Sequence, residues 1–304
     1  MSLLVVGTVA LDDLKTPFGE RANVLGGSAT HFAIAASFFT DVAISGVIGE
    51  DFPEEHQTYL RSRGINLDAV EKKNGKTFHW KGEYGFDLNT AITRGTELGV
   101  LEAFHPRVPA TLQATPFVFL ANVAPGVQNE FLTQIRQPKF LALDSMNLWI
   151  KNCKEELIQV IRKVDAVFLN EGETRQLTEE PILAKAARKI LSWGPKALFV
   201  KQGEYGALLF QGSRVFSAPG LPLESVFDPT GAGDSFAGGA MGYLARTGDL
   251  SFENLQKAVI VGSVMASFNV EDFGPDRLRT VSLAEIRKRA GDFRELAHFE
   301  EVVL

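Results

Sequence analysis

The chain has 304 residues, of which 45% are hydrophobic and 22% are charged, so it can bury a sizeable core as a soluble globular protein. Its net charge of −6 at pH 7 argues against nucleic acid as a main partner, because binding to phosphates requires a clustered basic surface. A single cysteine, Cys153, and the lack of an uncharged apolar run of roughly 18 residues indicate a cytoplasmic protein without a membrane partner.

Short apolar runs alternate with helical patterns along most of the chain. Strands are predicted over Leu3–Val9, Val42–Gly49, Phe117–Val123, Phe140–Met146, Ala166–Glu171, Ala197–Gly203 and Ala207–Gln211. Helices are predicted over Ser28–Phe39, Pro53–Arg63, Gln128–Arg136, Lys154–Lys163 and Ala184–Trp193. Nearly continuous apolar strands are typical of a parallel sheet buried on both faces. The alternation therefore predicts an α/β fold with a doubly wound, mostly parallel sheet.

The C-terminal part becomes helical, with helices predicted over Gly233–Arg246, Phe252–Phe268 and Leu283–Ala290. Ser282 and Glu285 have the spacing of a capping box, which places the start of the last helix between them.

One polar segment interrupts the alternation. In Thr77–Tyr84 the aromatic residues Phe78, Trp80 and Tyr84 alternate with polar ones, which is the period of a half-exposed strand. We expect a small β lid, formed mainly by residues 73–100 and by the segment 12–22 after the first strand. The chain otherwise shows no linker, so a single domain over residues 1–304 is predicted. The exposed side of the lid could cover a pocket or pair with a second subunit in a homodimer.

Polar residues stand at the ends of five of the predicted strands: Asp12, Asn122, Asp144 with Asn147, Asn170 with Glu173, and Lys201. Any one of them is explained by the polarity of loops. Ligands of open parallel sheets, however, bind beyond the carboxyl ends of the strands. Together these residues predict a shared site.

The strongest local feature is the run Asp228–Ser235, which reads Asp-Pro-Thr-Gly-Ala-Gly-Asp-Ser before an apolar periodic stretch. The glycines should therefore lie at a helix N-terminus, where free N–H groups and the helix dipole attract anions. Asp234, in the first turn, faces the same point and can accept a proton from an attacking hydroxyl. The alternative is an ordinary capped helix with an aspartate in its first turn.

The longer run Asp228–Gly239 resembles the C-terminal signature of the PfkB, or ribokinase-like, carbohydrate kinase family. Further segments resemble parts of the same family in the same order along the chain: Gly7–Asp12, Leu25–Ser28, Asn170–Glu173, Lys201–Gly206 and Ser267–Gly274. The resemblance implies a ribokinase-like fold, with helices on both faces of the sheet and a β lid over the substrate.

The resemblance also implies transfer of the ATP γ-phosphoryl group to an alcohol. Asp234 would be the catalytic base, and the backbone N–H groups of Gly231, Ala232, Gly233 and Asp234 would form an anion hole. Asn170 and Glu173 would order Mg²⁺, through water because this ion dehydrates reluctantly. The nucleotide would be bound by Lys201, Gly203, Gly206, Thr230 and Asn269. The family resemblance leaves a monovalent cation such as K⁺ open.

The substrate is predicted to contact Asp12, Gly26, Gly27, His31, Asn122, Asp144 and Asn147. His31 departs from the family pattern, which has asparagine there, so it either contacts substrate or is a satisfied helix residue. Asp12 with Asp144 or Asn147 suits an unphosphorylated sugar or related polyol, which we favour. Stacking of Phe78 and Trp80 on a base would instead indicate a nucleoside kinase. A ligand-binding homologue without turnover is the third alternative.

Overall fold

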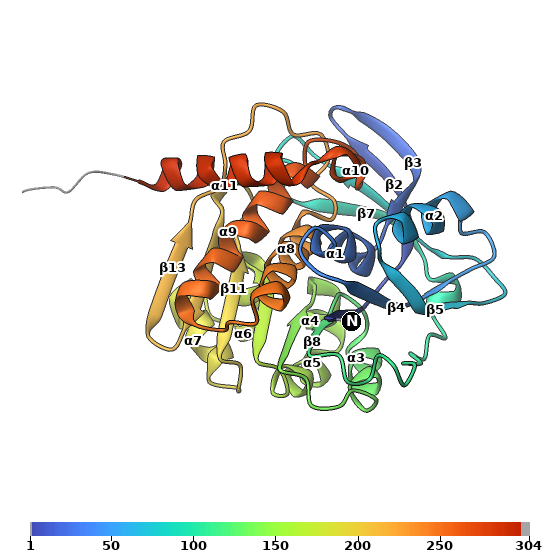
Figure 1. Ribbon diagram of the computed structural model, residues 1–304, viewed down its shortest axis with the longest axis horizontal. Coiled ribbons are helices and arrows are strands. Elements are labelled where there is room, and N and C mark those ends of the chain that lie inside the picture. The colour runs from blue at the N-terminus through green and yellow to red at the C-terminus, as the bar shows by residue number, and fades with distance from the viewer. Residues whose placement is uncertain (1, 299–304) are drawn as a thin grey trace, which may run out of the picture.

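The structure, a computed structural model, describes residues 2–298 and is built on a nine-stranded sheet (Figure 1). The strand order is β13-β12-β11-β10-β9-β8-β1-β4-β5. Neighbours from β11 to β5 are parallel, whereas β12 and β13 join antiparallel at one edge, so the sheet is mostly parallel as predicted. The strand bounds are β1 Leu3–Val6, β4 Val42–Ile48, β5 Asn66–Lys72, β8 Phe117–Leu120, β9 Phe140–Asp144, β10 Ala166–Asn170, β11 Ala197–Lys201, β12 Ala207–Gln211 and β13 Arg214–Ala218.

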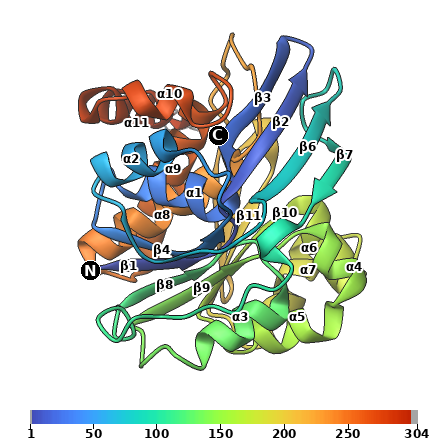
Figure 2. The ribbon, with the colours of Figure 1, turned by 90° about the vertical axis from the view of Figure 1, so that its right-hand side faces the viewer.

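Helices cover both faces of this sheet, which confirms the doubly wound prediction (Figure 2). One face carries α1 (Ser28–Ala36), α2 (Glu54–Ser62), α8 (Ala232–Thr247), α9 (Phe252–Asn269), α10 (Asp276–Thr280) and α11 (Leu283–Ala297). The other carries α3 (Pro125–Leu132), α4 (Asn147–Asn152), α5 (Lys154–Ile161), α6 (Glu171–Thr178) and α7 (Leu183–Leu191). Along β1, Leu3 and Val5 enter one core and Leu4 and Val6 the other, as the period of a strand requires. Among the described residues, we find no helix with both the length and the apolar character needed to cross a membrane.

A second, four-stranded sheet has the order β3-β2-β6-β7. Its strands are β2 (Ala10–Thr16), β3 (Gly19–Gly26), β6 (Phe78–Tyr84) and β7 (Ala91–Glu97). Strands β6 and β7 fall within the predicted segment 73–100, whereas β2 begins before the predicted segment 12–22 and β3 extends beyond it. On β2, Asp12 and Leu14 are buried while Lys15 is exposed. Because Asp12 pairs in register with Trp80, the side chains of Trp80 and Tyr84 lie on the buried face of this sheet.

Three differences from the predicted elements have local causes. The first predicted strand divides at Gly7, where a side chain would collide with Ala121 and Ser28, and the chain continues into the second sheet. Strands β5 and β13 went unpredicted because they lie at the two edges of the main sheet and carry polar residues. The short helices α4, α6 and α10 have five to eight residues and hence little apolar periodicity.

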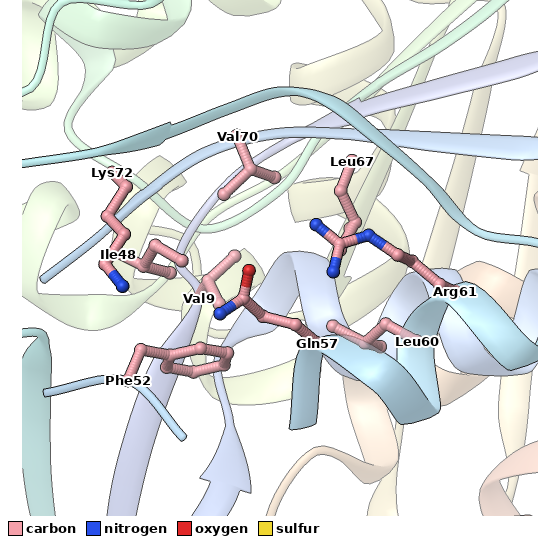
Figure 3. A pocket seen from close by; sticks show the side chains of 9 residues that line it. All are labelled: Val9, Ile48, Phe52, Gln57, Leu60, Arg61, Leu67, Val70 and Lys72. Atoms are coloured by element: carbon pink, nitrogen blue, oxygen red, sulfur yellow. The ribbon is translucent and has the colours of Figure 1, made fainter. Parts of the chain in front are cut away.

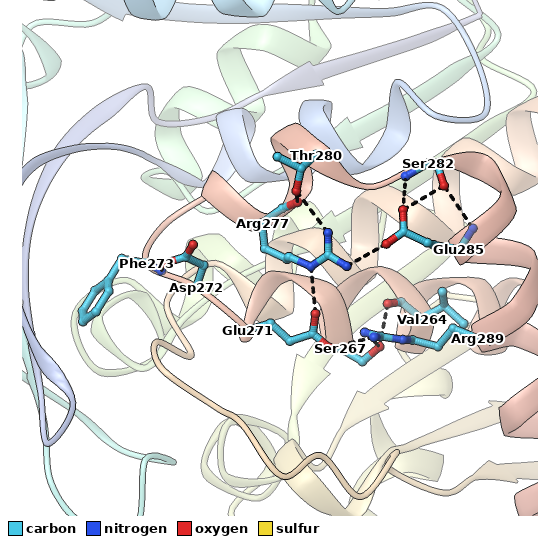
Figure 4. A network of polar contacts seen from close by, with 10 residues as sticks. All are labelled: Val264, Ser267, Glu271, Asp272, Phe273, Arg277, Thr280, Ser282, Glu285 and Arg289. Atoms are coloured by element: carbon cyan, nitrogen blue, oxygen red, sulfur yellow. Dashed lines mark hydrogen bonds and ion pairs between the residues drawn. The ribbon is translucent and has the colours of Figure 1, made fainter.

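The C-terminal helix is tied to α9 by charges around Arg277 and Arg289 (Figure 4). The predicted capping box is confirmed, because Ser282 Oγ accepts from the Glu285 amide at 3.2 Å and Glu285 accepts from the Ser282 amide. Arg277 bridges Glu271 and Glu285 at 3.0 and 2.9 Å, and Arg289 contacts Glu271 at 2.7 Å. These pairs hold the chain that follows α9 in place.

Helix α8 packs closely on α1 at Gly238, where a methyl group would overlap the Phe32 carbonyl. We therefore expect Gly238→Ala to destabilise the fold by about 1–3 kcal/mol, because an overfilled contact forces the two helices apart. Gly126→Ala on α3 is the matched control, since nothing lies within 4 Å of the added methyl. Thermal melting of both variants checks this, and equal melting temperatures would contradict the close packing.

Candidate active site

A buried ion pair joins the carboxyl ends of two main-sheet strands. Lys201 ends β11, and its Nζ lies 2.6 Å from Asp144 Oδ2 at the end of β9, with the two side chains 17% and 4% exposed. Burial alone would lower the pKa of Lys201, but the carboxylates of Asp144 and Glu173 outweigh it, so the pKa is raised and the ammonium stays charged. A side chain at Gly233 would press against this ammonium, so Lys201 also borders the glycine turn.

That turn begins α8 in the way the sequence predicts. Gly231 is the N-cap with φ 75°, a left-handed conformation that favours glycine. The amide of Ala232 donates to the Pro229 carbonyl at 3.1 Å and that of Ser235 to Gly231 at 2.8 Å. Within residues 2–298, the amides of Gly233 and Asp234 are left without an acceptor. An anion would therefore meet these two amides, whereas the part predicted for Ala232 is not supported.

Asp234 lies in the first turn of α8 among other charged groups. Burial raises its pKa to about 7; the Asp144 carboxylate adds to this rise and the Lys201 ammonium opposes it. A carboxylate with a pKa near neutrality is suited to accept a proton from a hydroxyl at physiological pH. The arrangement fits the catalytic base predicted at Asp234.

A second carboxylate approaches from β2. Asp12 is 4% exposed and lies against Gly26 and Gly27, and any side chain at Gly26 would overlap its carboxyl group. Burial raises the pKa of Asp12 well above its usual range, and the nearby carboxylates of Asp228 and Asp234 act in the same direction. Gly26 is thus required for Asp12 to hold this position, whereas a side chain at Gly27 would collide with the Thr8 carbonyl. These contacts fit the substrate roles predicted for Asp12, Gly26 and Gly27.

Beneath the turn lies a buried polar network centred on Asn269. Its Oδ1 accepts from Ser235 Oγ at 2.9 Å and lies 3.2 Å from His31 Nδ1, and its Nδ2 donates to the Thr230 carbonyl at 2.7 Å. Asn269 is fully buried and is the last residue of α9, one residue beyond the predicted end of this helix. The prediction that Asn269 binds nucleotide is not supported, because its polar atoms are occupied inside the protein.

His31 belongs to this network and is 1% exposed. Burial lowers its pKa to about 4, so the imidazole is neutral, and its ring lies directly under Gly231. Its Nε2 has no hydrogen-bond partner within the described part of the chain. His31 thus supports the turn through Nδ1 but is not fully satisfied, and its contact with substrate stays a prediction.

Asn170 and Glu173 form the capping box of α6. The Asn170 amide donates to Glu173 Oε2 and the Glu173 amide donates to Asn170 Oδ1, both at 2.7 Å. Burial raises the pKa of Glu173 to about 7, and Lys201 lies close enough to oppose this rise. Residues 2–298 contain no cluster of three His, Cys, Asp or Glu side chains able to enclose a metal ion. The two residues fit the predicted role only for Mg²⁺ that keeps most of its ligands as water and phosphate.

The remaining predicted residues lie around this centre. Gly203 and Gly206 form the turn between β11 and β12, with φ 59° and 102°, and the Asn89 side chain of the lid lies against Gly203. Thr230 is 9% exposed, and its amide donates to Asp228 Oδ1 at 2.9 Å. Gly203, Gly206 and Thr230 stay predictions for nucleotide binding.

Two residues predicted to bind substrate, Asn122 and Asn147, make none of the contacts described above with the glycine turn or the Lys201–Asp144 pair. Asn122 Nδ2 donates to Met146 Sδ at 3.0 Å, and its Oδ1 accepts from Trp149 Nε1 at 2.9 Å, so its amide is already engaged. Asn147 is exposed in the first turn of α4. Both stay predictions.

Two further residues at this site were given no role from the sequence. Asp228 is fully buried and accepts from the amides of Thr230 and Gly274, both at 2.9 Å. Tyr84, at the end of β6, accepts a hydrogen bond from Thr230 Oγ1 at 3.2 Å. Asp228 is the first residue of the run Asp228–Gly239, so its place in that motif could have indicated a role. Nothing in the local sequence indicated that Tyr84 lies beside Thr230.

A separate cavity of about 180 Å³ lies between α2 and strands β4 and β5 (Figure 3). Apolar side chains such as Phe52 and Leu60 form its walls, and Gln57, Arg61 and Lys72 supply polar atoms. None of the predicted site residues lines it.

The comparisons agree with this geometry. The profile described as pfkB family carbohydrate kinase matches residues 11–280. The chain belongs to this family. It is therefore a phosphotransferase with an alcohol acceptor, as the resemblance implied.

Among curated relatives, the chain is 30% identical over 256 residues to a cytidine kinase of Thermococcus kodakarensis, covering 81% of this chain and 89% of that protein. Among solved structures, it resembles the nucleoside kinase of Methanocaldococcus jannaschii with a TM-score of 0.77 and 21% identity, over 96% of this chain and 99% of the other. It also resembles a putative ribokinase II from E. coli, solved with ATP and Mg²⁺, with a TM-score of 0.78 and 17% identity, over 96% of this chain and 99% of the other. The structural matches support the ribokinase fold.

The pKa of Asp234 leads to a pH prediction. A base must be unprotonated, so kcat/KM should reach a plateau about one pH unit above an inflection near 7 and fall about tenfold per pH unit well below it. Asp234→Asn should abolish turnover while ATP still binds. The measurement is a pH–rate profile of ADP release.

Glu173 has a pKa in the same range, so Glu173→Gln is the control that separates the two carboxyl groups. The inflection should persist in this variant even if its rate is lower. An inflection that vanishes in Glu173→Gln, or near-normal turnover of Asp234→Asn, would contradict the assignment of Asp234 as base.

Proposed function

We propose that the protein is a nucleoside kinase, which transfers the γ-phosphoryl group of ATP to a sugar hydroxyl of a nucleoside. The observation that carries this is the position of Trp80, whose side chain shares the buried face of the lid with Asp12. The resemblance to the cytidine kinase supports the same acceptor class. A hydroxyl held by Asp12 and a base beside Trp80 would place the two parts of a nucleoside under one lid.

The indole has a defined place on the lid. Gly82 leaves room for it, because a side chain there would overlap the ring, and Trp80 Nε1 donates to Thr93 Oγ1 at 3.2 Å. The nitrogen edge is therefore fixed on β7 while the ring stays half-buried. A fixed aromatic ring is a suitable stacking platform for a base.

The reaction follows from the groups at the turn. The attacking hydroxyl oxygen forms a bond to the γ-phosphorus, the bond from that phosphorus to the β–γ bridging oxygen breaks, and ADP leaves. Asp234 takes the hydroxyl proton. The amides of Gly233 and Asp234, together with Lys201, hold the negative charge of the transferred group. Bound Mg²⁺ would neutralise the phosphates, with Asn170 and Glu173 ordering its water.

Two further parts of the proposal concern a cation and a partner. A monovalent cation such as K⁺ stays a prediction, because the two amides that donate to Asp228 leave lone pairs of its carboxylate free. A homodimer through the lid would use the exposed edge strand β7. The outer face of the lid carries ion pairs such as Arg94–Glu83, so pairing at the edge is more favourable than burial of that face.

A panel of nucleosides and sugars, assayed for ADP release with Mg-ATP, tests the acceptor class. We expect nucleosides to be turned over, and Trp80→Ala to raise the nucleoside KM by a factor that corresponds to the loss of about 1–3 kcal/mol of stacking. Phe86→Ala is the matched lid control, because Phe86 is 98% exposed at the turn after β6. Turnover of sugars alone, or equal effects of the two variants, would contradict the proposal.

A further inference from the structure

Tyr84 connects the lid to the catalytic turn. It is the last residue of β6 and faces the same side of the lid as Asp12. The hydroxyl of Thr230 donates to its Oη at 3.2 Å, across a sequence separation of 146 residues. Thr230 directly precedes Gly231, where α8 and its two free amides begin.

Three contacts fix Thr230 in position. Its amide is held by Asp228 at 2.9 Å and its carbonyl by Asn269 at 2.7 Å. Neither partner belongs to the lid: Asp228 lies just before α8, and Asn269 is the last residue of α9. The third contact, from the Thr230 hydroxyl, reaches the lid through Tyr84. The turn is therefore held on one side by the buried side chains of Asp228 and Asn269, and on the lid side by the Tyr84 hydroxyl.

The phenol is in a negative environment. Burial raises the pKa of Tyr84, and the carboxylates of Asp228, Asp12 and Asp234 raise it further. It is therefore neutral at all relevant pH values and can accept the hydrogen bond from the Thr230 hydroxyl without adding charge to the site. Asp12 is only 4% exposed with the lid in this position, so a substrate can reach it only when the lid moves away. Such a movement must break the bond from Thr230 to Tyr84.

We propose that Tyr84 is a positioning residue, which couples closure of the lid over the substrate to the arrangement of the turn that binds the transferred phosphoryl group. With the lid closed, the Tyr84 hydroxyl orients Thr230 and so the amides of Gly233 and Asp234. With the lid open, Thr230 keeps only its contacts with Asp228 and Asn269. The coupling rests on the phosphoryl transfer described above and does not depend on which alcohol is the acceptor.

Steady-state kinetics test the coupling. Tyr84→Phe should lower kcat three- to tenfold, the effect of one lost hydrogen bond, while the KM for ATP changes less than twofold. Thr230→Val should lower kcat by a similar factor, and the double variant should be no slower than the slower single one. Tyr59→Phe is the matched control, because it removes a buried phenol hydroxyl that has no hydrogen-bond partner among the described residues. Effects of Tyr84→Phe and Thr230→Val that multiply would overturn the proposal.

Amide hydrogen exchange gives a readout that needs no substrate. In Tyr84→Phe the segment 228–236 should exchange several-fold faster than in the wild type and in Tyr59→Phe, while α9 exchanges at the same rate. If the segment exchanges as in the wild type, the coupling is wrong whichever alcohol the enzyme phosphorylates. If the wild type turns over no nucleoside but the segment responds, the acceptor class fails and the coupling stands.

Discussion

The left-handed turn at Gly231 constrains the whole site. Its φ of 75° and its contact with the ring of His31 exclude a side chain, so the chain can reverse there only as glycine. The direction of α8 follows from this turn, and the same turn leaves the amides of Gly233 and Asp234 facing the carboxyl ends of the strands. The polar network below it, centred on Asn269, is buried and holds the turn by its carbonyl and by Ser235. Protein groups alone thus hold the carbonyl of the turn, and donors fixed in this way lower the cost of stabilising a transition state.

The charged groups around the turn are the Lys201 ammonium and the carboxyl groups of Asp144, Glu173 and Asp234. Lys201 is paired with Asp144 and lies within reach of Glu173 and Asp234, so its positive charge is retained in a buried position. The same ammonium keeps the pKa of Asp234 from rising further than about 7. An anion arriving at the turn would thus meet a cation and two amides, while the base beside it stays able to accept a proton. This combination suits phosphoryl transfer, in which charge stabilisation and positioning provide most of the catalysis.

Much of the main sheet could be predicted, because strands buried on both faces are apolar throughout, as in Leu3–Val6. The prediction of secondary structure failed for an edge strand that is mostly exposed and for a short helix. The edge strand Arg214–Ala218 lacks a continuous apolar run, because Arg214 and Ser217 interrupt it, and most of it is exposed. Helix α6 is too short to show an apolar periodicity, although Asn170 and Glu173 have the spacing of a capping box, and the structure shows the box.

By itself, the sequence predicted the fold class and the family, both of which are confirmed, and it supplied the proposed position of the base. The run Asp228–Gly239 is contiguous, so its turn and helix start follow from local backbone preferences. Only the tertiary structure decided which side chains meet. It paired Lys201 with Asp144, placed His31 and Asn269 under the turn, and brought Tyr84 to Thr230. The physical reason is that these contacts join segments far apart in the chain, where spacing carries no information and only the packing of helices and strands sets the distance.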